Sequence, residues 1–536
     1  MAETTLEATP TGTRTATAPP TGAPAPATSA GTPASATSAG TPAFAGSAGE
    51  TIPTEVSFRG ERSGTAPLTW GQRAIWHAIR RTAPNDHYFN IGRVLPLADR
   101  GRPATVAATL DALARLIERH EALRTRLVPA AADGEPAQCL AATGSLPVTI
   151  APATGLPEAA AEAETLLDGL SATRFDYPAE WPLRAALVTV GDRVTHAVLV
   201  LCHLAADGHA AEVLVRDLRL LVRRGSAGRP PATTPLDLAR DQHAERGRRR
   251  GAAALAHWEA GFRAAPPTMF PEPCAEPRSP RFWTGRIVSP ALARAVAAVA
   301  AAHGVSGSTV LLTASAALVA AGEGHRTAAV MPIVGNRTAE ALRDLVSTLS
   351  QDGLFVLDLA AAERSTGDGE EKGTGAARFT DLLPAAHRAA LRAYRAAVYD
   401  PVEWDALGER LHAEYGSEVH PYCCFNDMRL VERPVSEGPR PTARELAEEL
   451  TEARRRTAFG FPATQDRVAC RYCLHITEEG DALAVSLTAD TAYLPPEAIR
   501  AHLYAMEELI VTSAAGGPPL LAELRALLET AEGDRP

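Results

Sequence analysis

Apolar positions in the first half of the chain change period between strands and helices. Short apolar or alternating runs predict strands at 148–150, 185–190 and 195–201. Apolar residues at helical spacing predict helices over 68–79, 103–119, 210–221 and 252–262. We expect the last of these helices to close a first lobe that spans residues 61–265. Mixed helices and strands in one segment are typical of an α/β lobe.

The second half repeats this mixture over residues 266–536, which we expect to form a second lobe of similar build. It opens with a proline-rich stretch, 266–280, that predicts a linker crossing between the lobes. The spacing predicts helices over 289–303, 308–321 and 496–514. Strands are predicted over 328–334, 423–426, 470–476 and 482–487. A glycine- and charge-rich stretch, 363–377, predicts a loop.

Residues 1–60 have a different composition, dominated by Ala, Thr, Pro, Gly and Ser. The hexapeptide SAGTPA occurs twice there, at 29–34 and 38–43. Such a segment has too few large apolar groups to offset its ordering entropy. We therefore expect a disordered N-terminal tail.

Charge and hydropathy narrow the class of partner. The chain has 536 residues and a net charge of −10, which argues against nucleic acid as the main partner. The longest apolar stretch, 310–321, is too short to cross a bilayer, and the N-terminus lacks the pattern of a secretory signal. We expect a cytoplasmic protein without a membrane partner.

The seven cysteines include a C-x-x-C pair, Cys470 and Cys473, and the adjacent Cys423 and Cys424. Residues three apart in a strand point to opposite faces, so the C-x-x-C pair does not suit one metal ion. We expect the cysteines to be small apolar residues in a reducing compartment, with no metal site.

The segment CHLAADG, 202–208, carries the strongest candidate chemistry. It places His203 at a strand end, with Asp207 and Gly208 at the turn into the helix predicted over 210–221. A neutral imidazole can accept a proton from an amine or alcohol. Asp207 can pair with a cation, and Gly208 can allow close backbone approach. The pattern alone also fits a structural histidine.

Further motifs occur in order along the chain. These are LTWGQRAIW at 68–76, RHEALRTRL at 119–127, FDYPAEWPLRAAL at 175–187, HW at 257–258 and GNRTAEALRDLV at 335–346. Together they resemble the condensation domains of nonribosomal peptide synthetases, over about 67–515. The resemblance implies an α/β fold of two chloramphenicol-acetyltransferase-like lobes in a V-shaped pseudo-dimer, with the active site at their junction.

The resemblance also implies roles for single residues. His203 matches the second histidine of the family's H-H-x-x-x-D-G motif, which acts on the acceptor as a general base or by positioning and stabilising the attacking amine. Asp207 and Gly208 match the end of that motif. Arg337 matches the arginine that pairs with the motif aspartate, and a bidentate arginine would offset the cost of burying that carboxylate.

Cys202 departs from the family, which usually carries the first motif histidine there. Strand alternation predicts that Cys202 faces the core while His203 faces the opposite way. A rival interpretation makes Cys202 a nucleophile, but adjacent strand residues do not easily face each other. Cyclising relatives carry Asp at this position, which disfavours heterocyclisation. The stretches 345–354 and 418–429 also depart from the family pattern and leave the substrate class open.

The function implied by the resemblance is condensation of a carrier-bound thioester donor with a small-molecule amine or alcohol acceptor. The chain shows no adenylation-type phosphate loop and no L-G-G-x-S carrier motif, so we expect a freestanding monomer that meets acyl or peptidyl carrier proteins in trans. It would bind no cofactor itself, because the carrier brings the phosphopantetheine thioester. Two alternatives stay open: an acyl-coenzyme-A-dependent HxxxDG O-acyltransferase, and a catalytically inactive recruitment protein. The basic run at 246–250 is either a solvated helix face or a docking patch for an acidic carrier.

Overall fold

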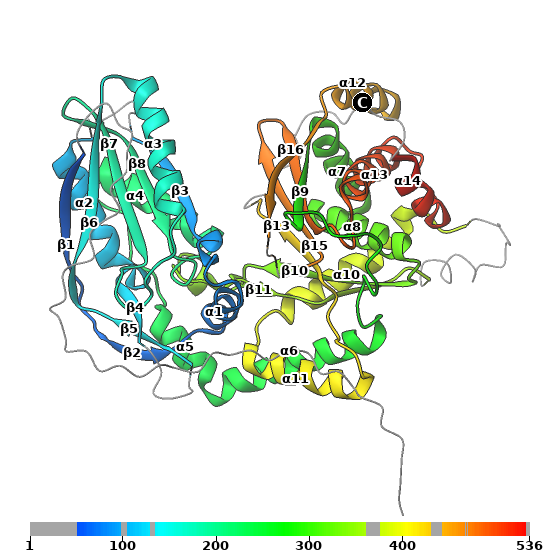
Figure 1. Cartoon of the computed structure of the whole chain (residues 1–536), viewed down its shortest axis with the longest axis horizontal. Coiled ribbons are helices and arrows are strands. Elements are labelled where there is room, and N and C mark those ends of the chain that lie inside the picture. Colours follow the sequence, from blue (N-terminus) through cyan, green and yellow to red (C-terminus); the bar gives the residue numbers. More distant parts are fainter. Residues whose placement is uncertain are drawn as a thin grey trace, which may run out of the picture. The chain divides into compact units, whose positions relative to one another are not determined.

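The computed structural model describes residues 51–97, 104–128, 135–360, 376–429, 442–466, 468 and 470–531 (Figure 1). The chain divides into two units, Met1–Gly46 and Ser47–Pro536, and all described residues lie in the second. Most of the predicted tail is therefore outside the described residues. Its last part is not a tail, because β1 (Ile52–Arg59) pairs along its whole length with β6 (Thr143–Ala153). Val56 and Phe58 alternate into the core, which the composition of the segment did not reveal.

The first lobe contains a five-stranded sheet in the order β1-β6-β7-β8-β3. The remaining strands are β3 (Ile91–Pro96), β7 (Leu183–Val190) and β8 (Arg193–Leu201). Helices α2 (Val106–Arg119) and α4 (Gly208–Arg224) pack on one face, and α3 (Leu156–Ser171) packs on the other. Adjacent strand residues point to opposite faces of the sheet. Leu187 accordingly packs in the core with α2 and α4, and Val188 packs in the core with α3. The three strands predicted in this lobe are confirmed.

A smaller group of elements completes this lobe. It consists of β2 (Gly64–Pro67), β4 (Thr125–Val128), β5 (Ala137–Leu140), α1 (Trp70–Thr82), α5 (Pro235–His243) and the short helices η1 (Asp86–Phe89) and η2 (Glu121–Arg124). Strands β2, β5 and β4 form their own sheet. Helix α1 begins with a capping box, in which Thr69 and Gln72 each accept a hydrogen bond from the other's backbone amide.

The second lobe contains an eight-stranded sheet in the order β11-β10-β13-β15-β16-β9-β14, with β12 paired to β10. The strands are β9 (Phe282–Ser289), β10 (Thr327–Val334), β11 (Gln351–Asp352), β12 (Phe355–Asp358), β13 (Cys423–Asp427), β14 (Ala458–Gln465), β15 (Tyr472–Glu479) and β16 (Ala482–Asp490). Its α-helices are α6 (Glu245–Ala264), α7 (Pro290–His303), α8 (Gly307–Glu323), α10 (Leu383–Arg395), α11 (Pro401–Tyr415), α12 (Ala443–Arg454), α13 (Pro496–Ala514) and α14 (Leu524–Ala531). The short helices are η3 (Glu340–Leu342), η4 (Phe379–Leu382) and η5 (Leu521–Glu523). Helices α7, α8 and α13 share one core with this sheet, so the predicted α/β class is confirmed.

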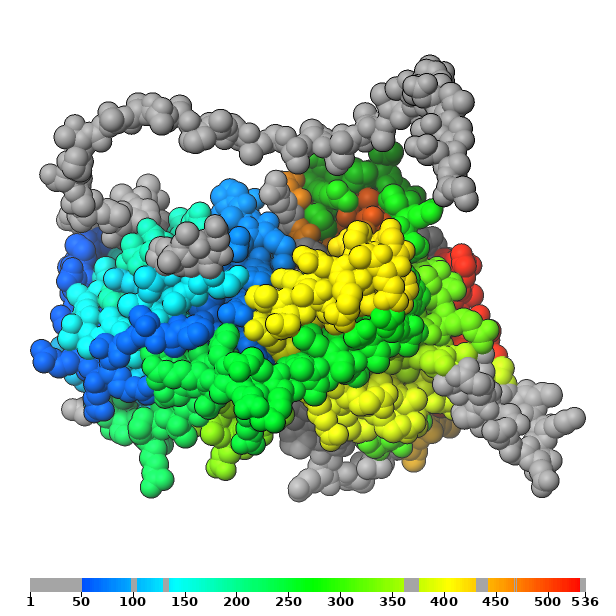
Figure 2. Space-filling model, turned by 90° about the horizontal axis from the view of Figure 1, so that it is seen from below, coloured from blue at the N-terminus to red at the C-terminus, as the bar shows by residue number. Residues whose placement is uncertain are grey.

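Helix α6, which the sequence predicts to close the first lobe, contributes buried side chains to the core of the second lobe. Its Trp258 is fully buried, and the ring packs edge-on against Tyr399 and Trp404. Figure 2 shows the outer face of α6 beside α11. The predicted linker 266–280 also enters this core, because Met269 and Phe270 are buried there. The buried apolar side chains of these two segments place them in the core of the second lobe, although the segments lie near the predicted lobe boundary in the sequence.

The C-x-x-C pair also differs from expectation. Cys470 and Cys473 are joined by a disulfide, with their Cα atoms 6.2 Å apart. Strand β15 begins only at Tyr472, so the alternation that separates residues three apart does not extend to Cys470.

Two other expectations fall partly outside what is described. The predicted loop 363–377 lies almost wholly outside the described residues. Within the described part, no single helix is long and apolar enough to cross a membrane, although the bent pair of α7 and α8 passes by length and composition.

Candidate functional site

His203 lies in the tight turn between β8 and α4. The backbone amides of Ala205 and Ala206 both donate to the carbonyl of Cys202, which folds the chain back just after the strand. The imidazole is half-buried, and the ring of Phe89 lies edge-on with its centroid 6.4 Å away. The turn therefore holds the imidazole of His203 at the end of the sheet.

The second lobe reaches His203 through Thr348. The Thr348 hydroxyl donates to the backbone carbonyl of His203, and its oxygen lies 3.4 Å from the imidazole Nδ1. Burial lowers the pKa of His203, although a hydrogen bond to its own backbone and the charge of Asp207 oppose this. The imidazole is accordingly neutral at pH 7, the form that can accept a proton.

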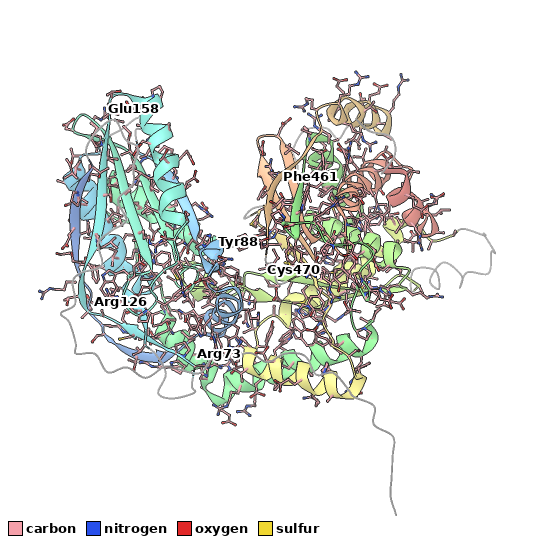
Figure 3. The ribbon with its side chains drawn as sticks, in the orientation of Figure 1. Arg73, Tyr88, Arg126, Glu158, Phe461 and Cys470 are labelled. Carbon is pink, nitrogen blue, oxygen red and sulfur yellow. A yellow bond between two sulfur atoms is a disulfide. The ribbon has the colours of Figure 1, made fainter. Side chains whose placement is uncertain are left out.

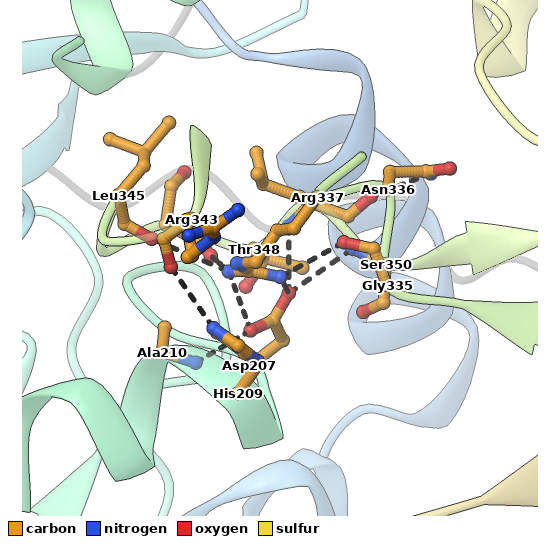
Figure 4. Close-up of polar contacts among 12 residues, drawn as sticks. Asp207, His209, Ala210, Gly335, Asn336, Arg337, Arg343, Leu345, Thr348 and Ser350 are labelled. Carbon is orange, nitrogen blue, oxygen red and sulfur yellow. Dashed lines mark hydrogen bonds and ion pairs between the residues drawn. The ribbon is translucent and has the colours of Figure 1, made fainter. Parts of the chain in front are cut away.

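Asp207 is buried at the N-terminus of α4 and binds Arg337, the predicted partner (Figure 4). Its two carboxylate oxygens lie 2.7 and 2.8 Å from the two terminal nitrogens of Arg337. The backbone amides of Ala210, Leu349 and Ser350 also donate to this carboxylate, at 2.9, 3.0 and 3.2 Å. Burial alone would raise the pKa of Asp207, but these donors hold it below its usual value.

Arg337 organises the loop that brings Thr348 to the site. It follows the end of β10 and donates to the carbonyls of Leu345 and Ser347, at 3.4 and 3.0 Å. Val346, between them, is buried in the core of the first lobe. This loop of the second lobe therefore inserts into the first lobe beside His203.

Gly208 is exposed, and a Cβ added there would meet no atom within 4 Å. The expected close backbone approach is therefore absent among the described residues. Gly208 is the first residue of α4, directly after the capping Asp207.

Cys202 faces the core, as predicted. It is 3% exposed and packs with Val198 and Val200 on the α3 side of the sheet. Its thiol borders a cavity of about 20 Å³ that Gln72 and Tyr177 also line. Burial raises the pKa of the Cys202 thiol to about 12, so the thiolate that a nucleophile needs is not formed at neutral pH.

Sequence reasoning identified His203, Asp207 and Arg337 but missed Thr348, Leu349 and Ser350. These three lie in the stretch 345–354, which the motif comparison marks only as a departure from the family pattern. Their contacts depend on the course of a loop across the lobes, for which a single sequence carries no periodic signal. Among the described residues, no group of three or more His, Cys, Asp or Glu side chains could hold a metal ion.

A family model described as "Condensation domain" matches residues 62–400, which is more than half of the chain. The chain belongs to the condensation-domain family. The matched region contains all the residues of the site described above.

Two relatives show the extent of the similarity. The phosphinothricin tripeptide synthetase PhsC of Streptomyces viridochromogenes is 30% identical over 328 residues, which are 58% of this chain and 30% of that protein. The isonitrile lipopeptide synthase of Mycobacterium tuberculosis is 29% identical over 385 residues, which are 67% of this chain and 14% of that protein. This condensation domain therefore spans less than a third of the length of these relatives.

Solved structures agree on the fold. A condensation domain that mediates chain release from the enacyloxin polyketide synthase matches with a TM-score of 0.59 at 17% identity, covering 88% of this chain and 85% of that one. The condensation domain of the monacolin K polyketide synthase MokA matches with a TM-score of 0.61 at 17% identity, covering 86% and 99%. These matches confirm the mixed α/β condensation-domain fold that the motifs predict.

Proposed function

We propose that this condensation domain joins a carrier-bound thioester donor to an amine or alcohol acceptor, forming an amide or an ester. The observation that carries the proposal is the imidazole of His203, which is half-buried and has a lowered pKa. It stands on a turn that the Asp207–Arg337 ion pair and Thr348 hold in place. A neutral base at a fixed position is what proton removal from an acceptor requires.

In the proposed reaction, His203 accepts a proton from the acceptor nitrogen or oxygen as that atom attacks the thioester carbonyl carbon. The new carbon–nitrogen or carbon–oxygen bond forms, and the carbon–sulfur bond breaks. The leaving thiolate takes the proton from the imidazolium, which restores neutral His203. Asp207 and Arg337 neutralise each other and touch no reacting atom in this scheme. They keep the turn that carries His203 from moving.

The proposed partner is an acyl or peptidyl carrier protein, which supplies the phosphopantetheine thioester in trans. Two relatives, a tripeptide synthetase and a lipopeptide synthase by name, support this class of reaction. A second donor class is an acyl-coenzyme A. The starter condensation domain of the rhizomide synthetase has been solved in complex with C8-CoA. It matches this chain with a TM-score of 0.60 at 15% identity.

An intact-mass assay tests the proposal and separates the donor classes. The chain is mixed with an acyl-loaded carrier protein and a panel of amines and alcohols, and the mass of the carrier is followed. We expect the carrier to lose its acyl group while an acyl-acceptor product of matching mass appears. If only acyl-coenzyme A is consumed, the donor is acyl-coenzyme A instead of a carrier-bound thioester. If neither donor is consumed faster than in a reaction without the protein, both donor classes are contradicted. That result favours a recruitment protein.

A further inference from the structure

We propose that Cys470 and Cys473 form a reversible redox site, at which a dithiol reductant opens the disulfide and loosens the turn before β15. The pair belongs to the second lobe (Figure 3) and is the C-x-x-C motif of the sequence. No step of the proposed condensation uses either sulfur. The redox site is therefore a property of the chain beyond its proposed function.

The two sulfurs differ in their access to a reductant. Cys470 is half-buried, whereas Cys473 is only 7% exposed. Thiol–disulfide exchange begins when a thiolate attacks one sulfur of the bond, so the accessible sulfur of Cys470 is the point of attack. The disulfide bond breaks, and Cys473 leaves as a thiolate and takes up a proton. The second thiol of the reductant then displaces Cys470. The products are two cysteine thiols and the oxidised dithiol, so two electrons and two protons pass to the protein.

The fold does not depend on this bond. Strand β15 pairs with β13 on one side and with β16 on the other. Tyr472 is buried in the core, and its hydroxyl is hydrogen-bonded to Ser315. The disulfide joins residues only three positions apart, and the restraint on an unfolded chain is smallest for the shortest loops. Both redox states therefore keep the sheet, as a reversible site requires.

The disulfide encloses Arg471, which holds two other segments of the second lobe. The amides of Arg471 and Tyr472 both donate to the carbonyl of Tyr422, at 3.1 and 3.0 Å. The guanidinium carbon lies 4.2 Å from the ring centroids of both Tyr422 and Tyr493. The guanidinium also donates to the carbonyl of Phe270. Arg471 thus fastens the turn before β13 and the segment 266–280 to the start of β15.

These two segments also bond to each other beside Arg471. The amide of His420 donates to the carbonyl of Pro267 at 2.8 Å, and the amide of Met269 donates to the carbonyl of Pro421 at 3.4 Å. The disulfide fixes the backbone on both sides of Arg471, because it ties the residue before β15 to the strand itself. Opening the bond removes that restraint where the two segments meet, while the strand pairs of β15 remain.

A third cysteine provides a matched control. Cys424 lies opposite Cys473 in the register of β13 and β15, and it is free. Burial raises the pKa of the Cys424 thiol, so the thiolate that would attack the neighbouring disulfide is not formed at neutral pH. The disulfide therefore waits for an external dithiol, and Cys424→Ser should leave its chemistry unchanged.

The first experiment treats the native chain briefly with dithiothreitol, alkylates it and maps the labelled peptides. We expect Cys470 to gain the label without denaturant, in the wild type and in Cys424→Ser alike, while the buried Cys202 stays unlabelled. Removal of the dithiol and addition of oxidised glutathione should restore the bond and protect Cys470 again. A disulfide that is reduced only after the chain is unfolded by denaturant is a structural bond and overturns the inference.

The second experiment measures hydrogen exchange in the oxidised chain, the reduced chain and the double variant Cys470→Ser/Cys473→Ser. Amides in 267–271 and 420–422 should exchange about tenfold faster in the last two, since even a short disulfide loop restrains local opening. Amides of β7 in the first lobe should be unchanged. Cys424→Ser should match the oxidised chain, and all samples should unfold cooperatively. Equal exchange in both redox states, or loss of cooperative unfolding on reduction of the wild type, overturns the inference.

Discussion

Arg337 of the second lobe binds both carboxylate oxygens of Asp207 in the first lobe, across 130 positions of the sequence. The side chains are only 6% and 4% exposed, so the pair is shielded from water. Asp207 also caps α4 through the amide of Ala210. One ion pair thus fixes the start of a helix, the turn with His203 and the loop with Thr348.

Breaking this pair from either side should destabilise the fold. Asp207→Asn or Arg337→Ala leaves one buried group without its partner, and each should cost about 3–5 kcal/mol of unfolding free energy. The double variant should cost less than the sum of the single effects, because contacting residues couple. A double-mutant cycle by chemical denaturation measures this coupling. Strictly additive effects contradict the contact.

Two N-terminal truncations should differ sharply. Removing residues 1–50 should leave the unfolding free energy unchanged, as the composition of that segment predicts. Removing residues 1–60 also deletes β1 and should cost about 3–6 kcal/mol, since fully burying a Val or a Phe contributes about 1.5–3 kcal/mol each. Val56 and Phe58 are the two side chains lost from the core. Equal stability of both truncated proteins, measured by denaturant unfolding, contradicts the assignment of β1.

Cys202 should be chemically inert. Its thiol is buried and its pKa is raised to about 12, so a thiol reagent at about pH 8 should leave it unmodified in the native chain. The internal control is Cys274, which should react faster than Cys202 because it is exposed to the reagent. Cys202→Ala should retain condensation activity. Peptide mapping after brief alkylation checks both sites, and rapid labelling of Cys202 with loss of product formation would restore the nucleophile interpretation.

Helices α1 and α11 are joined by a histidine that contacts two carboxylates. His77 lies 3.2 Å from Asp405 of α11 and 3.1 Å from Glu135. Nearby Arg73 of α1, which Figure 3 labels, pairs with Asp400 at 2.8 Å. The hydrogen bond to Asp405 raises the pKa of His77, with help from Glu135 and against the effect of burial. The bonded imidazolium stabilises the fold fully below the unfolded pKa of about 6.5, and this contribution is lost as pH rises through the raised folded value.

Replacing His77 should therefore matter more in acid than in base. The difference in unfolding free energy between the wild type and His77→Gln should be larger at about pH 6 than at about pH 9. The control is His257→Gln, which removes a half-buried histidine bonded to the backbone carbonyl of Leu354 instead of to carboxylates. The His77→Gln difference is compared with the difference for this control at each pH. A His77→Gln difference that grows with pH contradicts the account.

Periodic patterns predicted the elements that bury one continuous stripe or face. Strand β8 and helix α13 match the predicted 195–201 and 496–514 closely, because their apolar residues recur at strand and helix spacing. The motif resemblance likewise predicted His203, Asp207 and Arg337 as residues of the candidate site. The predictions that failed concern tertiary packing. The composition of residues 1–60 predicted a tail, although Val56 and Phe58 alternate into the core.

Other features had no local signal at all. The burial of Trp258 depends on Tyr399 and Trp404, which are far away in sequence. The contact of Thr348 with His203 spans 145 positions, and no pattern within either segment specifies it. The motif resemblance predicted the pairing of Asp207 with Arg337. The contacts of this pair with the backbone of Ser347, Leu349 and Ser350 depend on the course of the loop and could not be predicted.

Product formation by His203→Ala, with a carrier-bound donor and its accepted amine or alcohol, tests the central claim most directly. The matched control is His196→Ala on β8, a half-buried histidine bonded to Thr195 and outside the site. Loss of the catalytic base should lower kcat by about 10²–10⁴-fold, while the control keeps wild-type turnover and both variants unfold at wild-type temperature. A His203→Ala variant that turns over at the wild-type rate contradicts the assignment of His203 as the base.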